Sequence, residues 1–444
     1  MFKTLKNAFA IPEMRQKMLY TLFIILLYRI GAAIHVPYTD YEAMQSAFTF
    51  ADGNLFAYLN ILSGDAFSKA TLFALSISPY ITSSIVIQLL TIAIPALERK
   101  SKQGEEGQKF LTQLTRIVTV VLGFLTAFGY YMYMKNYGFL TERGNSVFGA
   151  FVIILCYAAG ASLIMWLAEK INDKGIGNGI SMILFANIIA GLPNLFSSVF
   201  YMVFPYGTFS SFQWWPGLVM AILTIVVILA IVILTIWVTN SERRIPIQYA
   251  KRVVGRKMYG GQNSTLPLKL NMAGVMPIIF ASSIATVPAT IASFFQGNKF
   301  WDGVTEIFGM DTVLYLIVFL LLIVGFSYFY ILISFDPVEV ANNIQSQGGA
   351  IPGIRSGKPT YQYIKKVLNR VTLMGAFFLG FIACFPLLVN MIASLCNYTA
   401  LSTLAFSGSS LLIIVGVILE TERDLGSQVA LRNYGSYNPK GFLG

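Results

Sequence analysis

Ten long apolar runs limit what this chain can fold into. They lie near residues 18–37, 71–97, 112–134, 147–168, 178–203, 215–239, 272–295, 312–334, 371–394 and 400–419. A helix crosses the hydrocarbon core of a bilayer with about 20 such residues. Only 11% of the residues are charged, whereas a soluble domain has about 25%. The sequence therefore predicts an all-α polytopic membrane protein with ten transmembrane helices.

Basic residues are unevenly shared among the segments that connect these runs. Ten spans place both termini on one side, and all but five of the 31 Lys and Arg residues fall in segments on that side. The exceptions are Arg29, Lys69, Lys135, Arg143 and Lys299. Cytoplasmic segments carry such an excess, which accounts for most of the net charge of +11. We expect both termini in the cytoplasm, with residues 1–17 forming a short surface helix.

The stretch 59–97 does not read as one uniform transmembrane helix. It breaks at Ser63, Gly64 and Asp65, and Ser68 and Lys69 follow where a lipid-facing helix needs apolar residues. Irregular backbone at membrane depth is tolerated only where protein or water satisfies its polar groups. We therefore expect a re-entrant segment over residues 55–70 that lines an aqueous path, followed by a span from about residue 71.

Ten spans divide into two halves of five, over residues 1–203 and 204–444. Five is odd, so the halves have opposite orientations, as in the inverted repeats of transport proteins. The second span of each half repeats a Pro, an Ile and a Ser at the same spacing. These residues are Pro79, Ile81 and Ser84 in the first half and Pro277, Ile279 and Ser282 in the second.

Two long cytoplasmic loops cover residues 239–270 and 336–370. The first alternates β-branched and basic residues around Gly255, a pattern that predicts an extended hairpin with a basic tip. Its charge indicates a docking surface for an anionic partner, although an ordinary solvated loop remains an alternative.

The sequence carries no enzyme motif and no metal-binding spacing. The glycine-rich run 175–181 follows a span rather than a strand, so a nucleotide loop is disfavoured. Cys156, Cys384 and Cys396 show no CxxC pair, and we interpret them as packing residues. No acidic residue falls in the middle of a run, which argues against an ion-coupled secondary carrier. We expect no cofactor.

Isolated amides and an aliphatic pair suggest what the spans do. Gln88 and Asn271 lie in or beside apolar helices, where they either bond between helices or mark a seam that can open. Ile81 and Ile85 lie four residues apart on one helical face. Such a pair is usually core packing, but beside a polar break it also suits a hydrophobic constriction.

Several long segments resemble the SecY family, the channel subunit of the general protein translocase. They are SISPYITSSIVIQLL (76–90), GIGNGISMILFANIIAGLP (175–193), RRIPIQYAKR (243–252), LPLKLNMAGVMPIIFASSI (266–284) and GIRSGKPTYQYI (353–364). The resemblance extends over essentially the whole chain. It implies a passive protein-conducting channel that translocates unfolded polypeptides and releases transmembrane segments sideways into a bacterial plasma membrane.

The resemblance also implies roles for particular residues. The aliphatic ring that closes the pore corresponds to Ile81, Ile85, Leu184, Ile279 and Ile413. The plug, a re-entrant helix, covers residues 55–70, with Leu59, Ser63, Gly64 and Asp65 among them. A lateral gate opens between spans 2 and 3 and spans 7 and 8, near Gln88 and Asn271.

Partners follow from the same resemblance. Docking of a ribosome or of the motor ATPase SecA is expected at Arg243, Arg244, Lys251, Arg252, Arg256, Lys257 and Arg355. SecE-type and SecG-type small subunits, signal peptides, nascent chains and lipids complete the expected partners. Two rival classes remain: a secondary carrier, which needs a buried ionisable pair, and a scaffold without a path, which needs no polar break at residues 63–69.

Overall fold

The computed structural model describes residues 8–49, 60, 63–203, 216–249, 252–254, 257–259, 263–272, 274–294, 300–301, 303–304, 312–395 and 402–436. A helix occupies each of the ten expected positions. These helices are α2 (Pro12–Gly31), α5 (Ser78–Ala93), α7 (Glu105–Asn136), α8 (Val147–Lys174), α9 (Gly179–Val203), α10 (Pro216–Asn240), α11 (Met276–Phe294), α13 (Val313–Ser334), α15 (Lys358–Leu395) and α16 (Ser402–Ser436). Shorter helices are α3 (Tyr41–Thr49), α6 (Pro95–Ser101) and α14 (Pro337–Ser346).

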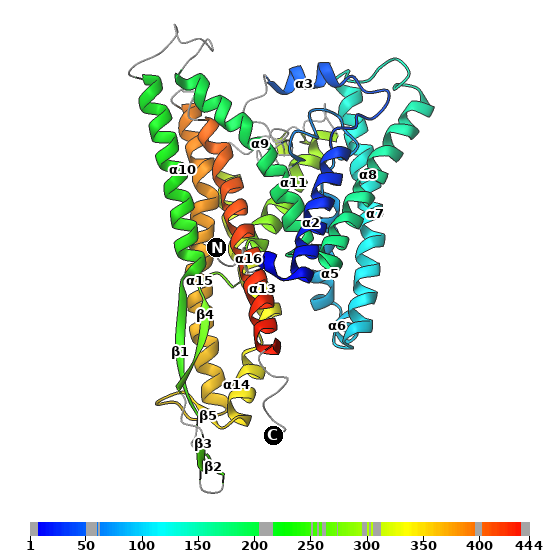
Figure 1. The fold of residues 1–444 in the computed structure, drawn as a ribbon. Helices are drawn as coiled ribbons and strands as arrows, with labels where there is room; N and C mark the ends of the chain where they lie inside the picture. The colour runs from blue at the N-terminus through cyan, green and yellow to red at the C-terminus, as the bar shows by residue number, and fades with distance from the viewer. Residues whose placement is uncertain are drawn as a thin grey trace.

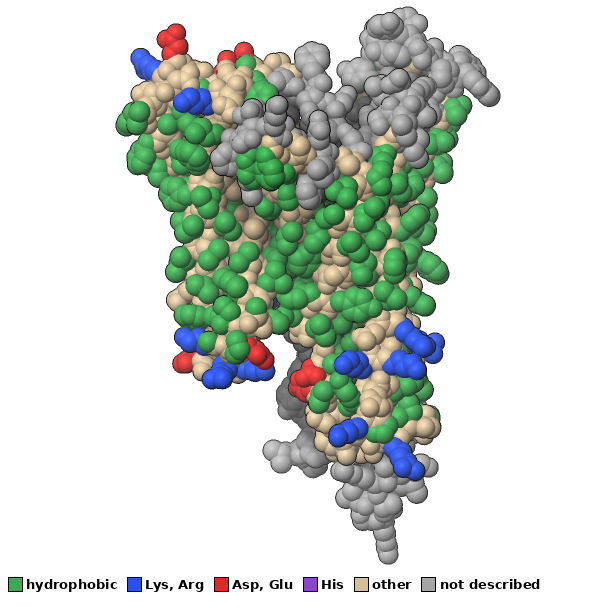
Figure 2. All heavy atoms as spheres, turned by 180° about the vertical axis from the view of Figure 1, so that it is seen from behind, with side chains coloured by type: hydrophobic (Ala, Val, Ile, Leu, Met, Phe, Trp, Pro, Cys, Tyr) green, Lys and Arg blue, Asp and Glu red, His purple; other side chains and the backbone are tan. Residues whose placement is uncertain are grey.

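The helices form a membrane-compatible bundle. Within the described residues, five helices are long and apolar enough to cross a bilayer, or six when the bent pair α5 and α6 counts as one span. On the face seen in Figure 2, apolar side chains cover the middle of the bundle, with Lys and Arg gathered below them and a smaller group of charged side chains above. The chain is therefore an all-α polytopic membrane protein, and the count of ten spans stays a prediction.

The second span differs from the expected run 71–97. Helix α5 begins only at Ser78, and the chain bends by 105° where α6 starts at Pro95. Positive φ angles at Ala70 and Ser76 keep the preceding stretch out of a helix. Pro79 suits the first turn of α5, whereas Pro95 lacks the N–H that would continue the helix. The expected helix start near residue 71 was therefore wrong, and the helix is interrupted at Pro95 instead of continuing straight to residue 97.

Contacts between helices define two groups. Helices α2, α5, α7, α8 and α9 pack on one another, and so do α10, α11, α13, α15 and α16. The groups meet along two edges: α9 contacts α10 and α16 at one, while α11 contacts α5 and α7 at the other (Figure 1). The space between the groups is therefore bounded by helices from both.

One packing arrangement occurs in both groups. The backbone before α5 crosses α8 so closely that a Cβ on Gly160 would lie 2.0 Å from the carbonyl oxygen of Leu72. The backbone before α11 crosses α15 in the same way, with 2.2 Å between a Cβ on Gly375 and the carbonyl oxygen of Leu270. Only glycine permits these two crossings.

The two long loops form one body beyond the helices, at the lower left of Figure 1. Strands β1 (Glu242–Tyr249) and β4 (Asn263–Lys269) pair antiparallel, with β2 (Arg252–Val254) and β3 (Lys257–Tyr259) pairing further along the hairpin. Strand β5 (Gly349–Ala350), from the second loop, pairs with β1. A buried apolar cluster beneath the sheet includes residues of both loops and of α15. The hairpin is as the sequence predicted, but its union with the second loop was not foreseen.

Candidate channel waist and plug

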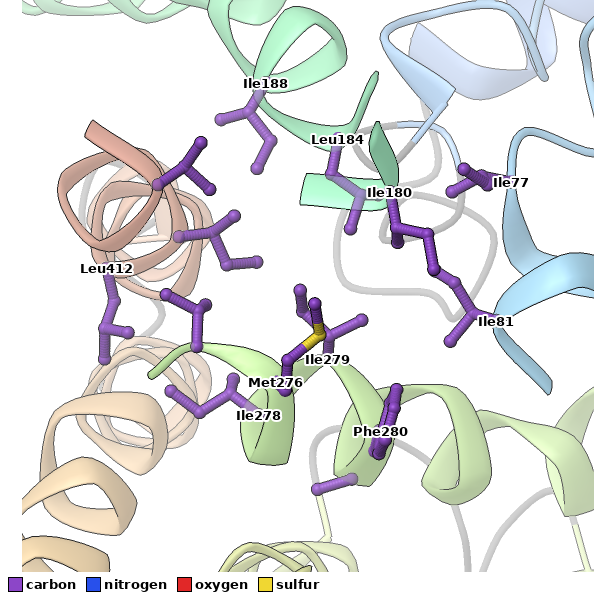
Figure 3. Close-up of a cluster of buried hydrophobic side chains, with 14 of the residues drawn as sticks. Ile77, Ile81, Ile180, Leu184, Ile188, Met276, Ile278, Ile279, Phe280 and Leu412 are labelled. Atoms are coloured by element: carbon purple, nitrogen blue, oxygen red, sulfur yellow. The ribbon is translucent and has the colours of Figure 1, made fainter. Parts of the chain in front are cut away.

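Five aliphatic side chains that the sequence singled out lie in one buried cluster. They are Ile81, Ile85, Leu184, Ile279 and Ile413, each no more than 3% exposed. They come from four helices, α5, α9, α11 and α16, which belong to both helix groups. Figure 3 shows Ile81, Leu184 and Ile279 directed toward a common centre. We call the buried aliphatic side chains around this centre the waist.

The waist contains more residues than the sequence indicated. Ile77, Ile180, Ile188 and Met276 belong to the same buried cluster, and Figure 3 shows them around the same centre. Ile180, Leu184 and Ile188 recur at four-residue spacing on α9. That spacing places three side chains on one helical face, and it was the signal that could have identified them. An aliphatic lining makes no strong bond with a polar group, so it excludes water when closed.

The plug segment precedes α5 beside the waist. Leu59 lies outside the described residues, whereas residues 64–70 form turns and a bend rather than the expected helix. Gly64 and Asp65 both adopt positive φ, which a helix cannot accommodate. The Ser63 hydroxyl donates to the carbonyl oxygen of Asn60 at 2.9 Å and accepts from the Phe67 N–H at 3.0 Å. Ser63 thus satisfies two backbone polar groups of the segment, as irregular backbone at membrane depth requires.

Two buried tyrosines hold the later part of this segment. The Tyr130 hydroxyl of α7 donates to the carbonyl oxygen of Phe67 at 2.6 Å, and the Tyr157 hydroxyl of α8 donates to that of Ala70 at 3.3 Å. The Phe67 ring packs on Tyr130, with 4.5 Å between ring centroids. These anchors were missed because nothing in the sequence relates α7 and α8 to the plug.

The edge between α5 and α11 is where a lateral gate was expected. Gln88 donates from Nε2 to the Ser84 hydroxyl at 3.2 Å, a bond within α5, and Asn271 is buried just before α11. No hydrogen bond joins these two amides in the described part of the chain. On the other side of α5, the buried Ser83 hydroxyl bonds with Thr119 of α7. Helix α5 is therefore bonded to α7 through a pair of buried hydroxyl groups. Among the described residues no such bond joins Gln88 to Asn271, so α5 is held less firmly to α11 than to α7 at these residues.

The expected docking residues lie mostly on the sheet body. Arg243 and Arg244 are exposed on β1, and Arg355 is exposed before α15. Lys251 and Arg256 lie outside the described residues, while Arg252 and Lys257 open the short strands β2 and β3. At the base of the hairpin, partial burial and the nearby charge of Arg423 lower the pKa of Lys269.

A buried ion pair joins α7 and α8. Arg116 Nη2 lies 2.9 Å from Glu169 Oε2, and the Glu169 side chain is 10% exposed. The sequence placed Glu169 just past a span, and the structure includes it in α8. Since Arg116 is half exposed and both residues belong to neighbouring helices of one group, the pair does not form a central ion site. The described residues contain no cluster of three metal-ligating side chains.

Comparison with known proteins decides the family. The family model SecY matches residues 71–422. The chain belongs to the SecY family. A protein translocase subunit SecY of Streptomyces galbus is 41% identical over 449 residues, covering 98% of this chain and 100% of that protein. The SecY subunit of Thermus thermophilus is 38% identical over 461 residues, with 100% and 99% covered.

Solved structures show the same SecY fold. A structure described as a protein conducting channel matches with a TM-score of 0.60 and 18% identity, covering 97% of this chain and 94% of that one. The canine Sec61 channel in a ribosome complex matches with a TM-score of 0.60 and 17% identity over the same shares. The expected SecY resemblance and fold class are therefore confirmed.

Proposed function

We propose that this SecY-family chain is the protein-conducting subunit of a translocase, and that the waist is its seal. The single observation that carries this is the convergence of Ile81, Leu184 and Ile279 from three helices on one centre. Aliphatic side chains close around any passing polypeptide without binding it strongly. The plug segment, anchored beside the waist by Tyr130 and Tyr157, supplies a second barrier. The chain does no chemistry in this role.

Opening of the channel would part the edge between α5 and α11. Residues 1–203 and 204–444 act as two halves, a division supported by the contact pattern and by the glycine crossings at Gly160 and Gly375. A signal sequence, itself an apolar helix, inserts at this edge near Gln88 and Asn271. Apolar segments then leave into the lipid, while polar segments pass the waist.

The sheet body would receive the partners that supply energy. Exposed Arg243, Arg244 and Arg355, with the basic hairpin tip at 251–257, suit the phosphate-rich surface of a ribosome. The same body would dock the motor ATPase SecA, and SecE-type and SecG-type subunits would pack on the helices. The docking face and both termini lie in the cytoplasm, and the membrane is the bacterial plasma membrane.

Reconstitution tests this function directly. The chain, co-purified with its small subunits and inserted into lipid vesicles with SecA and ATP, should protect an added secretory precursor from external protease. The same precursor without its signal sequence is the matched control and should stay accessible. Equal protection of both precursors, or of neither, would contradict a signal-gated channel.

A further inference from the structure

Arg29 is a charged side chain in the last turn of α2, the first of the expected spans. It lies on α2, among apolar residues that face outward, and is itself half-buried. A charged group within a membrane helix is costly unless it has polar partners. The groups that Arg29 contacts therefore indicate the role of its side chain.

One partner of Arg29 lies on α9, the helix that contributes Ile180, Leu184 and Ile188 to the waist. The Arg29 guanidinium donates from Nη2 to the carbonyl oxygen of Ala186 on α9. Ala186 lies between Leu184 and Ile188, two waist residues of the same helix. Any movement of α9 that widens the waist therefore also moves the carbonyl that Arg29 holds.

The other partner is the plug. A Cβ built on Gly64 would lie 2.9 Å from Arg29 Nη2 and 2.8 Å from the backbone oxygen of Asn187, so the plug backbone rests directly against this contact. Asp65 follows Gly64 directly in the chain, so its carboxylate belongs to the stretch of the plug that packs against Arg29. Asn60 Nδ2 donates to the same carboxylate at 3.0 Å and fixes its position.

We propose that Arg29 is a positioning residue that latches the plug to α9 in the closed channel, through Asp65 on one side and Ala186 on the other. The proposal deepens the function above and rests on it. The latch links the two barriers, because movement of α9 that widens the waist pulls the Ala186 carbonyl away from the arginine and so breaks the connection between α9 and the plug. Plug release and waist opening are then one transition.

The reconstituted complex tests the latch through ion conductance without precursor. We expect Asp65→Asn, which is nearly isosteric and keeps the Asn60 contact, to raise resting conductance about tenfold, equivalent to about 1.4 kcal/mol. Arg29→Gln should do the same, and Arg29→Lys should raise it less. The matched control is Lys135→Gln, which removes an exposed charge in the last turn of α7, outside the plug and the waist, and should leave conductance unchanged.

The double variant Asp65→Asn with Arg29→Gln separates a latch from two independent effects. If the residues act on each other, the double variant leaks no more than the leakier single variant. If the conductance of the double variant rises by the product of the two single-variant increases, or if Asp65→Asn leaves conductance unchanged, the latch is overturned. Signal-dependent protection of a precursor by the wild-type complex is measured in parallel. Its loss would contradict the channel function itself, whereas normal protection without a leak in the variants would contradict only the latch.

Discussion

The Tyr130 hydroxyl lies 2.6 Å from the carbonyl oxygen of Phe67, so helix α7 is bonded directly to the backbone of the plug segment. Both residues are at most 5% exposed, and their rings pack together. The later part of the plug is thereby joined to the first helix group. Movement of the plug during opening must either break this bond or occur in the residues before Phe67.

Removal of the Tyr130 hydroxyl should loosen the plug. Tyr130→Phe leaves the buried Phe67 carbonyl without this donor, at a cost of about 1–3 kcal/mol. We expect a higher resting ion conductance in vesicles that contain the complex. Tyr131→Phe is the control, because its hydroxyl faces Gly144 instead of the plug. Equal conductance of the two variants would refute the anchor.

The glycine crossings should be intolerant of any side chain. Gly160→Ala and Gly375→Ala would each place a methyl group about 2 Å from a backbone oxygen, and the forced shift should cost about 1–3 kcal/mol. Thermal unfolding in detergent should show a lower Tm for both. Gly325→Ala in α13, where a Cβ meets nothing within 4 Å, should leave Tm unchanged or higher. A lower Tm for Gly325→Ala, with an unchanged Tm for Gly160→Ala and Gly375→Ala, would contradict the prediction.

Charge at the hairpin tip should set the salt dependence of ribosome binding. Reversal of Arg256 and Lys257 is expected to weaken binding most at low salt and to reduce the slope of log Kd against log salt by about 2. Arg143→Glu, on a segment expected at the opposite membrane face, is the control. Binding measured across a salt series checks this, and an unaltered slope would exclude the tip from the contact.

Arg355 should matter to the motor more than to the ribosome. Its side chain is exposed on the second loop, which β5 joins to the hairpin body. We expect Arg355→Glu to block SecA-driven export while sparing ribosome-coupled insertion. Parallel assays of the two routes check it, and equal loss of both would show a general defect of the sheet body.

The sequence predicted the fold well because its main determinants are local. The length of the apolar runs located a helix at each expected place, and Ser63, Gly64 and Asp65 marked a real interruption. The start of α5 was misplaced by several residues because apolar composition alone does not reveal the positive φ angles at Ala70 and Ser76.

The site was less predictable because its contacts join distant segments. The four-residue spacing on α9 could have added Ile180 and Ile188 to the waist. No local pattern relates Tyr130 to Phe67, or Arg29 to Ala186, and the pairing of β1 with β5 joins two loops separated by α11 and α13. Such contacts depend on how the helices pack, which spacing along one chain does not determine.

Ile85→Gly compared with Ile87→Gly tests the waist most directly. Both isoleucines are buried on α5, at 1% and 4% exposure, and only Ile85 belongs to the waist cluster. Glycine at either position lowers the helix propensity of α5 by the same amount, so a difference in conductance between the two variants reports the position of the side chain. Resting ion conductance of the reconstituted complex should rise for Ile85→Gly and stay at the wild-type level for Ile87→Gly. Unchanged conductance in Ile85→Gly, or an equal rise in both variants, would contradict the seal.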